Sequence, residues 1–132
     1  MIQPTFTLKR NERINKKADF GKIYKEGVGL TNPYFVVLYI KNGLPFTRLA
    51  ISIKKKFGKA HKRNKLKRII KEIFRKNKQT VSICCDILII PRKELSDSFD
   101  EREKNYSFIK NHLLSLFEEI GKKNEKNISQ NN

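Results

Sequence analysis

Residues 54–78 read KKKFGKAHKRNKLKRIIKEIFRKNK, and this stretch decides the fold because dense charge and helical periodicity coincide in it. It holds thirteen lysines and arginines against a single acid, Glu72, so it carries +12 of the chain's net +17. Its apolar residues recur at the i, i+3, i+4, i+7 spacing of one helical face. These residues are Leu66, Ile69, Ile70, Ile73 and Phe74. The stretch therefore predicts a helix over about residues 60–77, with one face in a core.

The opposite face of this helix is basic. With an advance of 100° per residue, it collects His61, Asn64, Arg68, Lys71 and Arg75, flanked by Arg63, Lys67 and Lys65. On a face that is merely solvated, acidic residues would be interspersed to form i, i+4 pairs and to lower the self-repulsion. Only Glu72 is present, so the uncompensated charge predicts a polyanionic partner, and nucleic acid is the obvious candidate.

Length and composition predict one domain, because 132 residues can bury a core without disulfides or a structural metal. No apolar run reaches the length that spans a bilayer, and the first residues lack the apolar stretch of a signal peptide. We therefore expect a cytoplasmic protein without membrane contact. Cys84 and Cys85 are adjacent, which strains a mutual disulfide, and we expect them to be buried or half-buried free thiols.

The regions that precede the basic helix predict one helix and two strands. Residues 17–26 have the pattern of a short helix, with Phe20, Ile23 and Tyr24 on one face. Residues 34–40 are apolar on both faces, as in a central strand, and residues 48–53 form a second strand. The turn residues Asn42 and Gly43 between them predict an antiparallel hairpin.

Residues 82–90, after the basic helix, predict a third strand. The order strand, helix, strand then favours a parallel pair joined by a crossover, which the general rule makes right-handed. Residues 96–104 are a polar connection, and a last helix is expected over about 105–120, with Gly121 as its end. Its apolar face consists of Tyr106, Ile109, Leu113, Leu116, Phe117 and Ile120.

The basic stretch resembles the signature of the bacterial ribonuclease P protein component, which has the pattern G-x-A-x-x-R-N-R-x-K-R-x-x-R. The positions that match in residue and spacing are Gly58, Ala60, Arg63, Asn64, Lys67 and Arg68. Lys65 and Lys71 stand where the pattern has arginine, so they keep the charge but lose the forked guanidinium. Residues 17–27, 35–36 and 86–93 resemble further family segments in the same order. We expect a domain over 8–121, with flexible tails at 1–7 and 122–132.

This resemblance implies an α+β fold, a single-domain sandwich similar to a ribosomal-protein domain. It implies a mixed sheet of about four strands packed with about three helices, and a left-handed β-α-β crossover. The left-handed crossover contradicts the general rule. We adopt it because the motif match is specific and the rule has exceptions.

The resemblance also implies a role as the protein subunit of ribonuclease P, which removes the 5′ leader of precursor tRNA. The RNA subunit is then the catalyst and holds Mg²⁺ mainly through its phosphates, with one protein monomer per RNA. By resemblance, Arg63, Asn64 and Lys65 contact this RNA, with Lys67, Arg68 and Lys71 within reach of its phosphates. The leader-binding residues implied are Phe20, Tyr24, Val36 and Leu38. Spacing alone would place Phe20 and Tyr24 in the core, so both interpretations stay open.

Catalysis by the protein itself is not indicated. A metal nuclease needs clustered carboxylates, and Asp19, Asp86 and Asp97 show no such grouping in the sequence. His61 and His112 stand apart, without a visible nucleophile or acid–base partner. We expect no catalytic residue and no metal site in the protein. The alternatives are a structural RNA- or DNA-binding protein of ribosomal or nucleoid type, and an independent metal nuclease.

Overall fold

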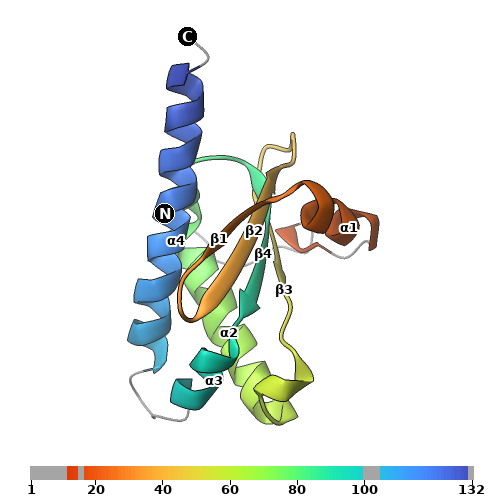
Figure 1. Cartoon of the computed structure of the whole chain (residues 1–132), viewed down its shortest axis with the longest axis vertical. Coiled ribbons are helices and arrows are strands. Elements are labelled where there is room, and N and C mark those ends of the chain that lie inside the picture. The colour runs from red at the N-terminus through yellow and green to blue at the C-terminus, as the bar shows by residue number, and fades with distance from the viewer. Residues whose placement is uncertain (1–11, 15–16, 100–104, 131–132) are drawn as a thin grey trace, which may run out of the picture.

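The computed structural model describes the backbone of residues 12–14, 17–99 and 105–130, and side chains as far as Lys123. The helices within these residues are α1 (Lys17–Glu26), α2 (Ala60–Asn77), α3 (Lys93–Phe99) and α4 (Asn105–Gln130). Four strands are β1 (Val28–Thr31), β2 (Phe35–Lys41), β3 (Arg48–Ile51) and β4 (Cys85–Pro91). The short 3₁₀ turns η2 (Lys55–Phe57) and η3 (Lys78–Val81) flank α2. The predicted α+β class is confirmed (Figure 1).

The strands form one mixed sheet in the order β1-β2-β4-β3. β1 and β4 both pair antiparallel with β2, which confirms the central position of that strand. β3 pairs in parallel with β4 and not with β2, so the predicted hairpin between β2 and β3 is wrong. β4 is buried on both faces from Cys85 to Ile89 and therefore takes an inner position. The loop after β2 is long enough to pass the width of that one intervening strand.

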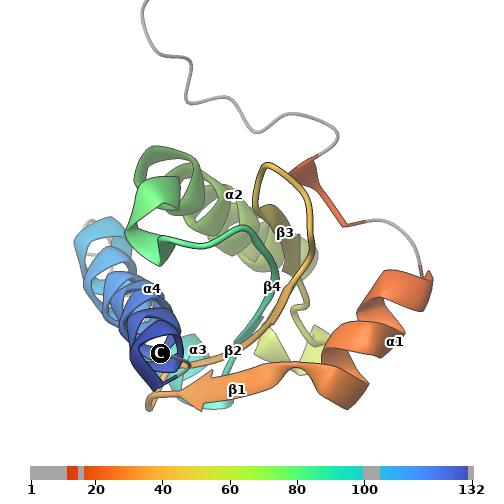
Figure 2. The ribbon, with the colours of Figure 1, turned by 90° about the horizontal axis from the view of Figure 1, so that it is seen from above.

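The crossover from β3 through α2 to β4 is left-handed, as the resemblance implied. In Figure 1 the parallel strands run downward, α2 returns behind the sheet, and β4 lies to the left of β3. Figure 2 places α2 and α1 on opposite sides of the strands. The apolar stripe of α2 packs against one face of the sheet. Leu66, Ile70, Ile73 and Phe74 are fully buried there.

Each face of the sheet has its own apolar cluster. On one face, α2 and α4 pack against alternate residues of β2, including Phe35 and Val37. On the other face, a smaller cluster joins Ile23 of α1 to Leu88 of β4. Side chains of Phe20, Leu38, Ile40 and Ile90 pack against this second cluster but stay half-buried. The second face is therefore only partly covered, because α1 is short.

The structure contains two elements that the sequence patterns did not predict. β1 spans four residues, and one of them is glycine, so its own pattern is too short to identify. α3 occupies part of the expected polar connection and brings the number of helices in the described residues to four, where about three were expected. Leu95 and Phe99 of α3 are buried, and the Phe99 ring meets the Phe57 ring edge-on at 5.8 Å. Tertiary contacts thus stabilise a helix too short to form alone.

Gly121 does not end the last helix, because α4 continues to Gln130. The helix therefore runs through most of the segment that we expected to be a flexible tail. A Cβ atom at position 121 would lie 3.2 Å from the Ser82 Oγ and 3.4 Å from the Thr80 carbonyl oxygen. The glycine thus permits a close approach of α4 to η3. The apolar face of α4 is as predicted, although Tyr106 is only half-buried.

The two thiols have different environments. Cys85 is buried in β4, whereas Cys84 is exposed, so the expectation of burial is wrong for Cys84. Burial raises the pKa of the Cys85 thiol to about 12. Within the described residues, no helix is both long and apolar enough to cross a bilayer.

Candidate nucleic-acid interface

Helix α2 presents the predicted basic face to solvent. We call six of its residues the basic ridge: Arg63, Asn64, Lys65, Lys67, Arg68 and Lys71. Asn64, Lys65 and Arg68 are exposed, and the other three are half-buried. The buried stripe on the opposite side holds the helix in the core, so its backbone supplies a rigid support for these charges.

Several neighbouring cations are occupied by contacts within the protein. Lys62 donates to the Ser96 carbonyl oxygen at 3.0 Å, and its Nζ lies 5.3 Å from the centre of the Phe57 ring. Arg63 Nε donates to the Gly58 carbonyl oxygen at 3.1 Å, so part of its guanidinium serves the start of the helix. Arg75 and Lys76 share Glu72, at 3.8 and 3.0 Å. Because these side chains already have partners within the protein, fewer cations of α2 are available to bind another molecule.

The available cations lie in the middle of the ridge. Among the described residues, no carboxylate pairs with Lys67, Arg68 or Lys71. Desolvation lowers the pKa of Lys71, with the nearby charges of Arg13 and Lys67 as further causes. Concentrated positive charge without an acid is the electrostatic arrangement that favours a polyanion.

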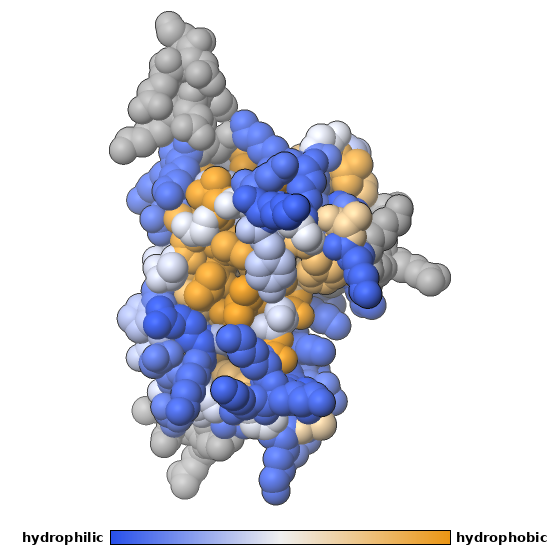
Figure 3. All heavy atoms as spheres, turned by 45° about the vertical axis from the view of Figure 1, so that its right-hand side comes forward, coloured by the Kyte–Doolittle hydropathy of each residue, from blue (hydrophilic) through white to orange (hydrophobic). Residues whose placement is uncertain are grey.

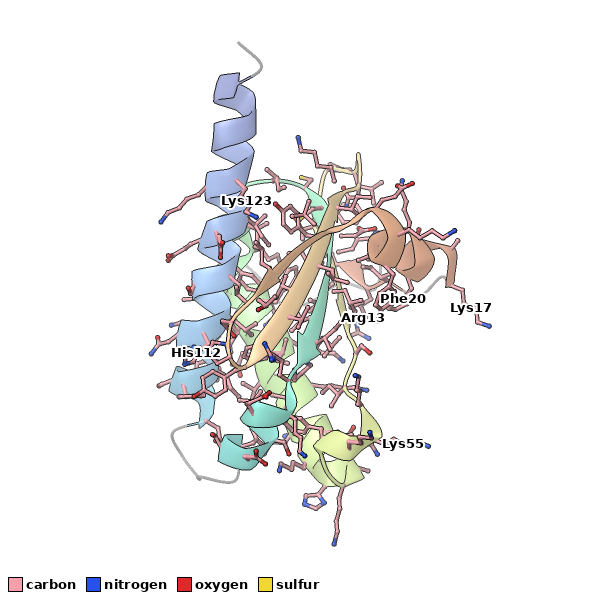
Figure 4. All side chains as sticks on the ribbon, viewed as in Figure 1. Arg13, Lys17, Phe20, Lys55, His112 and Lys123 are labelled. Carbon is pink, nitrogen blue, oxygen red and sulfur yellow. The ribbon has the colours of Figure 1, made fainter. Side chains whose placement is uncertain are left out.

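The ridge borders a small cavity that reaches the other predicted site. Lys67, Lys71, Arg13 and Phe20 line this cavity of 170 Å³, together with apolar residues such as Ile14. Figure 4 shows Phe20 on the side of α1 that faces the strands, with Arg13 nearby. The structure thus brings Lys67 and Lys71 of one predicted set together with Phe20 of the other.

The remaining leader-binding candidates lie along the partly covered face of the sheet. Val36 and Leu38 alternate with the buried residues of β2 and point to the α1 side, where both are half-buried. Phe20 packs at the edge of the same cluster as Leu38. Tyr24 is 57% exposed, so its interpretation as a core residue is wrong. Figure 3 shows an apolar area on this side of the molecule, bordered by hydrophilic side chains.

Comparison with known proteins identifies the family. The sequence model of the Ribonuclease P family matches residues 8–121, which is most of the chain. The chain belongs to the ribonuclease P protein family. The ribonuclease P protein component of Thermotoga maritima is 47% identical over 116 residues, which cover 88% of this chain and 97% of the relative.

Solved structures of ribonuclease P proteins have the same fold. The protein from Thermotoga maritima superposes with a TM-score of 0.76 at 48% identity, covering 83% of this chain and 97% of that one. The protein from Staphylococcus aureus gives a TM-score of 0.67 at 37% identity, covering 77% and 92% of the two chains. Family membership therefore extends over the sheet and the helices that carry both predicted sites.

In this ribonuclease P family member, the structure adds cations that we had not predicted for the site. A larger cavity of 530 Å³ is lined by Val36 together with Lys54, Lys56, Arg92 and Lys93, and by one acid, Glu94, which lies 3.6 Å from Arg92. Phe57, Ile90 and Pro91 supply its apolar wall. Lys54 and Lys56 belong to the basic stretch, but Arg92 and Lys93 follow β4 and are far away in sequence. Only the pairing of β2 with β4 brings them beside Val36.

Two acidic residues of the described structure, Asp86 and Glu72, are engaged in structural contacts. Asp86 binds Arg48 and Asn42, and Glu72 binds two cations of α2. No three His, Cys, Asp or Glu side chains come together within the described part of the chain. The His112 ring packs against Tyr34 and Phe108, with ring centres 4.6 Å apart in both cases.

Proposed function

We propose that the chain binds the RNA subunit of ribonuclease P through the basic ridge and the 5′ leader of precursor tRNA through the face beside α1. It thereby assists removal of the leader, with the RNA subunit as catalyst. The observation that carries this proposal is the cavity that joins the two surfaces, where Lys67 and Lys71 meet Phe20. A complex of the RNA subunit with precursor tRNA can then contact both surfaces at once.

Contact with the RNA subunit rests on electrostatics. Lys67, Arg68 and Lys71 have no acidic partner in the described structure and stand on a helix fixed by its buried face. Lysine and arginine side chains that neutralise phosphates release condensed counterions, which makes the affinity high and salt-dependent. Lys65 supplies a point charge in place of an arginine fork, so this contact is less directional.

Recognition of the leader rests on stacking beside positive charge. Phe20 and Tyr24 present rings at the edge of a half-buried apolar surface that includes Val36 and Leu38. A single-stranded base stacked on an aromatic ring contributes about 1–3 kcal/mol, while nearby cations hold the phosphates. Mature tRNA has no leader and lacks these contacts. The protein therefore favours the precursor and lets the product leave.

The catalytic ion belongs to the RNA subunit in this proposal. Mg²⁺ prefers oxygen ligands in octahedral geometry, and the carboxylates of Asp86 and Glu72 already bind cationic side chains. The chain's contribution is to reduce the repulsion between RNA phosphates, so that the RNA folds and recruits Mg²⁺ at low concentration. We further propose that one monomer acts with each RNA subunit, in the cytoplasm.

A cleavage assay at low Mg²⁺ tests the function. Precursor tRNA is incubated with the protein alone, with the RNA subunit alone, and with both. We expect cleavage only from the combination. Cleavage by the protein alone would show that the chain is an independent nuclease. Equal affinity of the complex for precursor and mature tRNA would indicate a nucleic-acid coat protein instead.

A further inference from the structure

Arg48 holds a buried carboxylate inside the sheet. Asp86 is only 5% exposed, and it lies directly opposite Arg48 on the neighbouring parallel strand. Arg48 Nε donates to Asp86 Oδ1 at 2.8 Å, and Nη2 donates to Oδ2, so the pair is bidentate. Asn42 Nδ2 donates to the same Oδ1 at 2.9 Å. This fork-to-fork geometry fixes the plane of the guanidinium.

The fixed guanidinium also reaches helix α1. Arg48 Nη1 lies 3.5 Å from Asp19 Oδ2, and Asp19 stands in the first turn of α1, directly before Phe20. The two side chains are 19% and 26% exposed, so water screens this contact only in part. Asp19 thus connects the first turn of α1 to a group whose position is set inside the sheet.

The other end of α1 is held by close backbone packing. A Cβ atom at Gly27 would lie 2.4 Å from the Ile23 carbonyl oxygen and 3.2 Å from that of Tyr39, so only glycine fits there. Ile23, in the second half of the helix, is fully buried. The contact between Asp19 and Arg48 is a side-chain attachment at the end where Phe20 lies, and just before the helix the Ile14 N–H donates to the Leu49 carbonyl oxygen at 3.1 Å.

We propose that Asp19 and Arg48 are positioning residues that place α1, and with it Phe20, against the sheet for recognition of the leader. This inference rests on the proposed function of that surface. A partly exposed ion pair of this length adds little stability. The ion pair acts on geometry, because a helix attached at both ends keeps its angle to the strands. A helix attached at one end is free to change that angle.

The informative variant is Asp19→Asn, because it removes the negative charge from the link to α1 and leaves the pair of Arg48 with Asp86 intact. Glu26→Gln is its control, since Glu26 is an exposed acid of the same helix and its loss changes the net charge equally. Thermal unfolding is measured first. If Asp19→Asn does not fold, Asp19→Ser takes its place. Each folded variant is then assembled with the RNA subunit.

The readout is the ratio of the affinities of the assembled complex for precursor and mature tRNA. We expect Asp19→Asn to lower this ratio roughly three- to tenfold, a fraction of what one stacked base contributes. Its affinity for the RNA subunit should match that of Glu26→Gln. An unchanged ratio would overturn the inference.

A double-mutant cycle with Phe20→Ala separates positioning from a general loss of structure. If Asp19 acts through Phe20, Asp19→Asn should have almost no further effect on the ratio once Phe20 is alanine. An equal loss in both backgrounds would refute the positioning role. If Phe20→Ala itself leaves the ratio unchanged, the proposed leader-binding function fails. If only Asp19→Asn leaves it unchanged, that function stands and the inference alone fails.

Discussion

Single cations of α2 differ in what they contact, although the sequence shows them as one charged run. Lys62 donates to Ser96 and lies beside two aromatic rings. Lys76 pairs with Glu72 at 3.0 Å. Arg68 is exposed and has no acidic partner in the described structure. The contribution of a residue to binding therefore depends on the contacts that its side chain already makes.

Replacing Arg68 by alanine should weaken binding of the RNA subunit without unfolding the protein, because the side chain is exposed. The slope of log affinity against log salt concentration should fall by about one for each lost phosphate contact. Titrations of the RNA at several salt concentrations measure this slope. Lys76→Ala is the control, since Glu72 already neutralises that charge, and it should change the slope less. Equal slopes for Arg68→Ala and the unmodified chain would contradict the ridge as the RNA surface.

Lys71 predicts a pH dependence of RNA binding. Its pKa is lowered from the usual 10.5, so in the free protein it loses its proton before an ordinary lysine does. An RNA phosphate favours the charged form, so binding takes up a proton. The affinity should therefore fall as the pH rises through the lowered pKa. Short binding measurements across the alkaline range check this dependence, and Lys71→Arg should reduce it. The same dependence in Lys71→Arg would exclude Lys71 as the source.

The adjacent cysteines should differ in reactivity. The Cys84 thiol is exposed, whereas burial raises the pKa of Cys85 to about 12, and only the thiolate reacts. A thiol reagent at neutral pH should modify one cysteine per native chain and both in denaturant. The thiol of Cys85 loses its proton above pH 9.0 in the unfolded chain but keeps it in the folded chain. The free energy of unfolding should therefore fall as the pH rises above 9.0. Rapid modification of both native thiols would rule out this difference.

At the scale of elements, the buried stripe of α2 carries the ridge. Replacing Ile70 by alanine should lower the free energy of unfolding by about 2–5 kcal/mol, because the side chain is fully buried in the larger cluster. Chemical denaturation measures this loss. Ile69 stands next to it but is only half-buried, so Ile69→Ala should cost less. Equal costs would contradict the difference in burial between the two side chains.

At the scale of the whole molecule, the two faces predict two salt dependences. Assembly with the RNA subunit depends on phosphate neutralisation and should weaken steeply with salt. Preference for precursor over mature tRNA depends more on stacking and apolar contact, so its salt dependence should be smaller. Affinities measured over a range of salt with excess RNA subunit separate the two. Parallel losses would indicate that the leader is held mainly through its phosphates.

The charge, the family motif and the elements with strong periodicity could be predicted from the sequence alone. The predicted bounds of α1 and α2 agree with the structure, because each helix has a regular apolar face that short-range spacing encodes. The parallel pair joined by α2 also followed from element order. The predicted ridge lies on one exposed helix face for the same reason.

Which elements pack against one another became clear from the folded structure. A pattern shows that a strand buries both faces but not which strand pairs with it, so the position of β4 between β2 and β3 was missed. α3 and β1 depend on distant partners, and Gly121 serves packing against η3 where the sequence suggested a helix end. The link from Asp86 through Arg48 to Asp19 joins three elements. Such contacts depend on distances between residues far apart in the chain, and local periodicity contains no information about those distances.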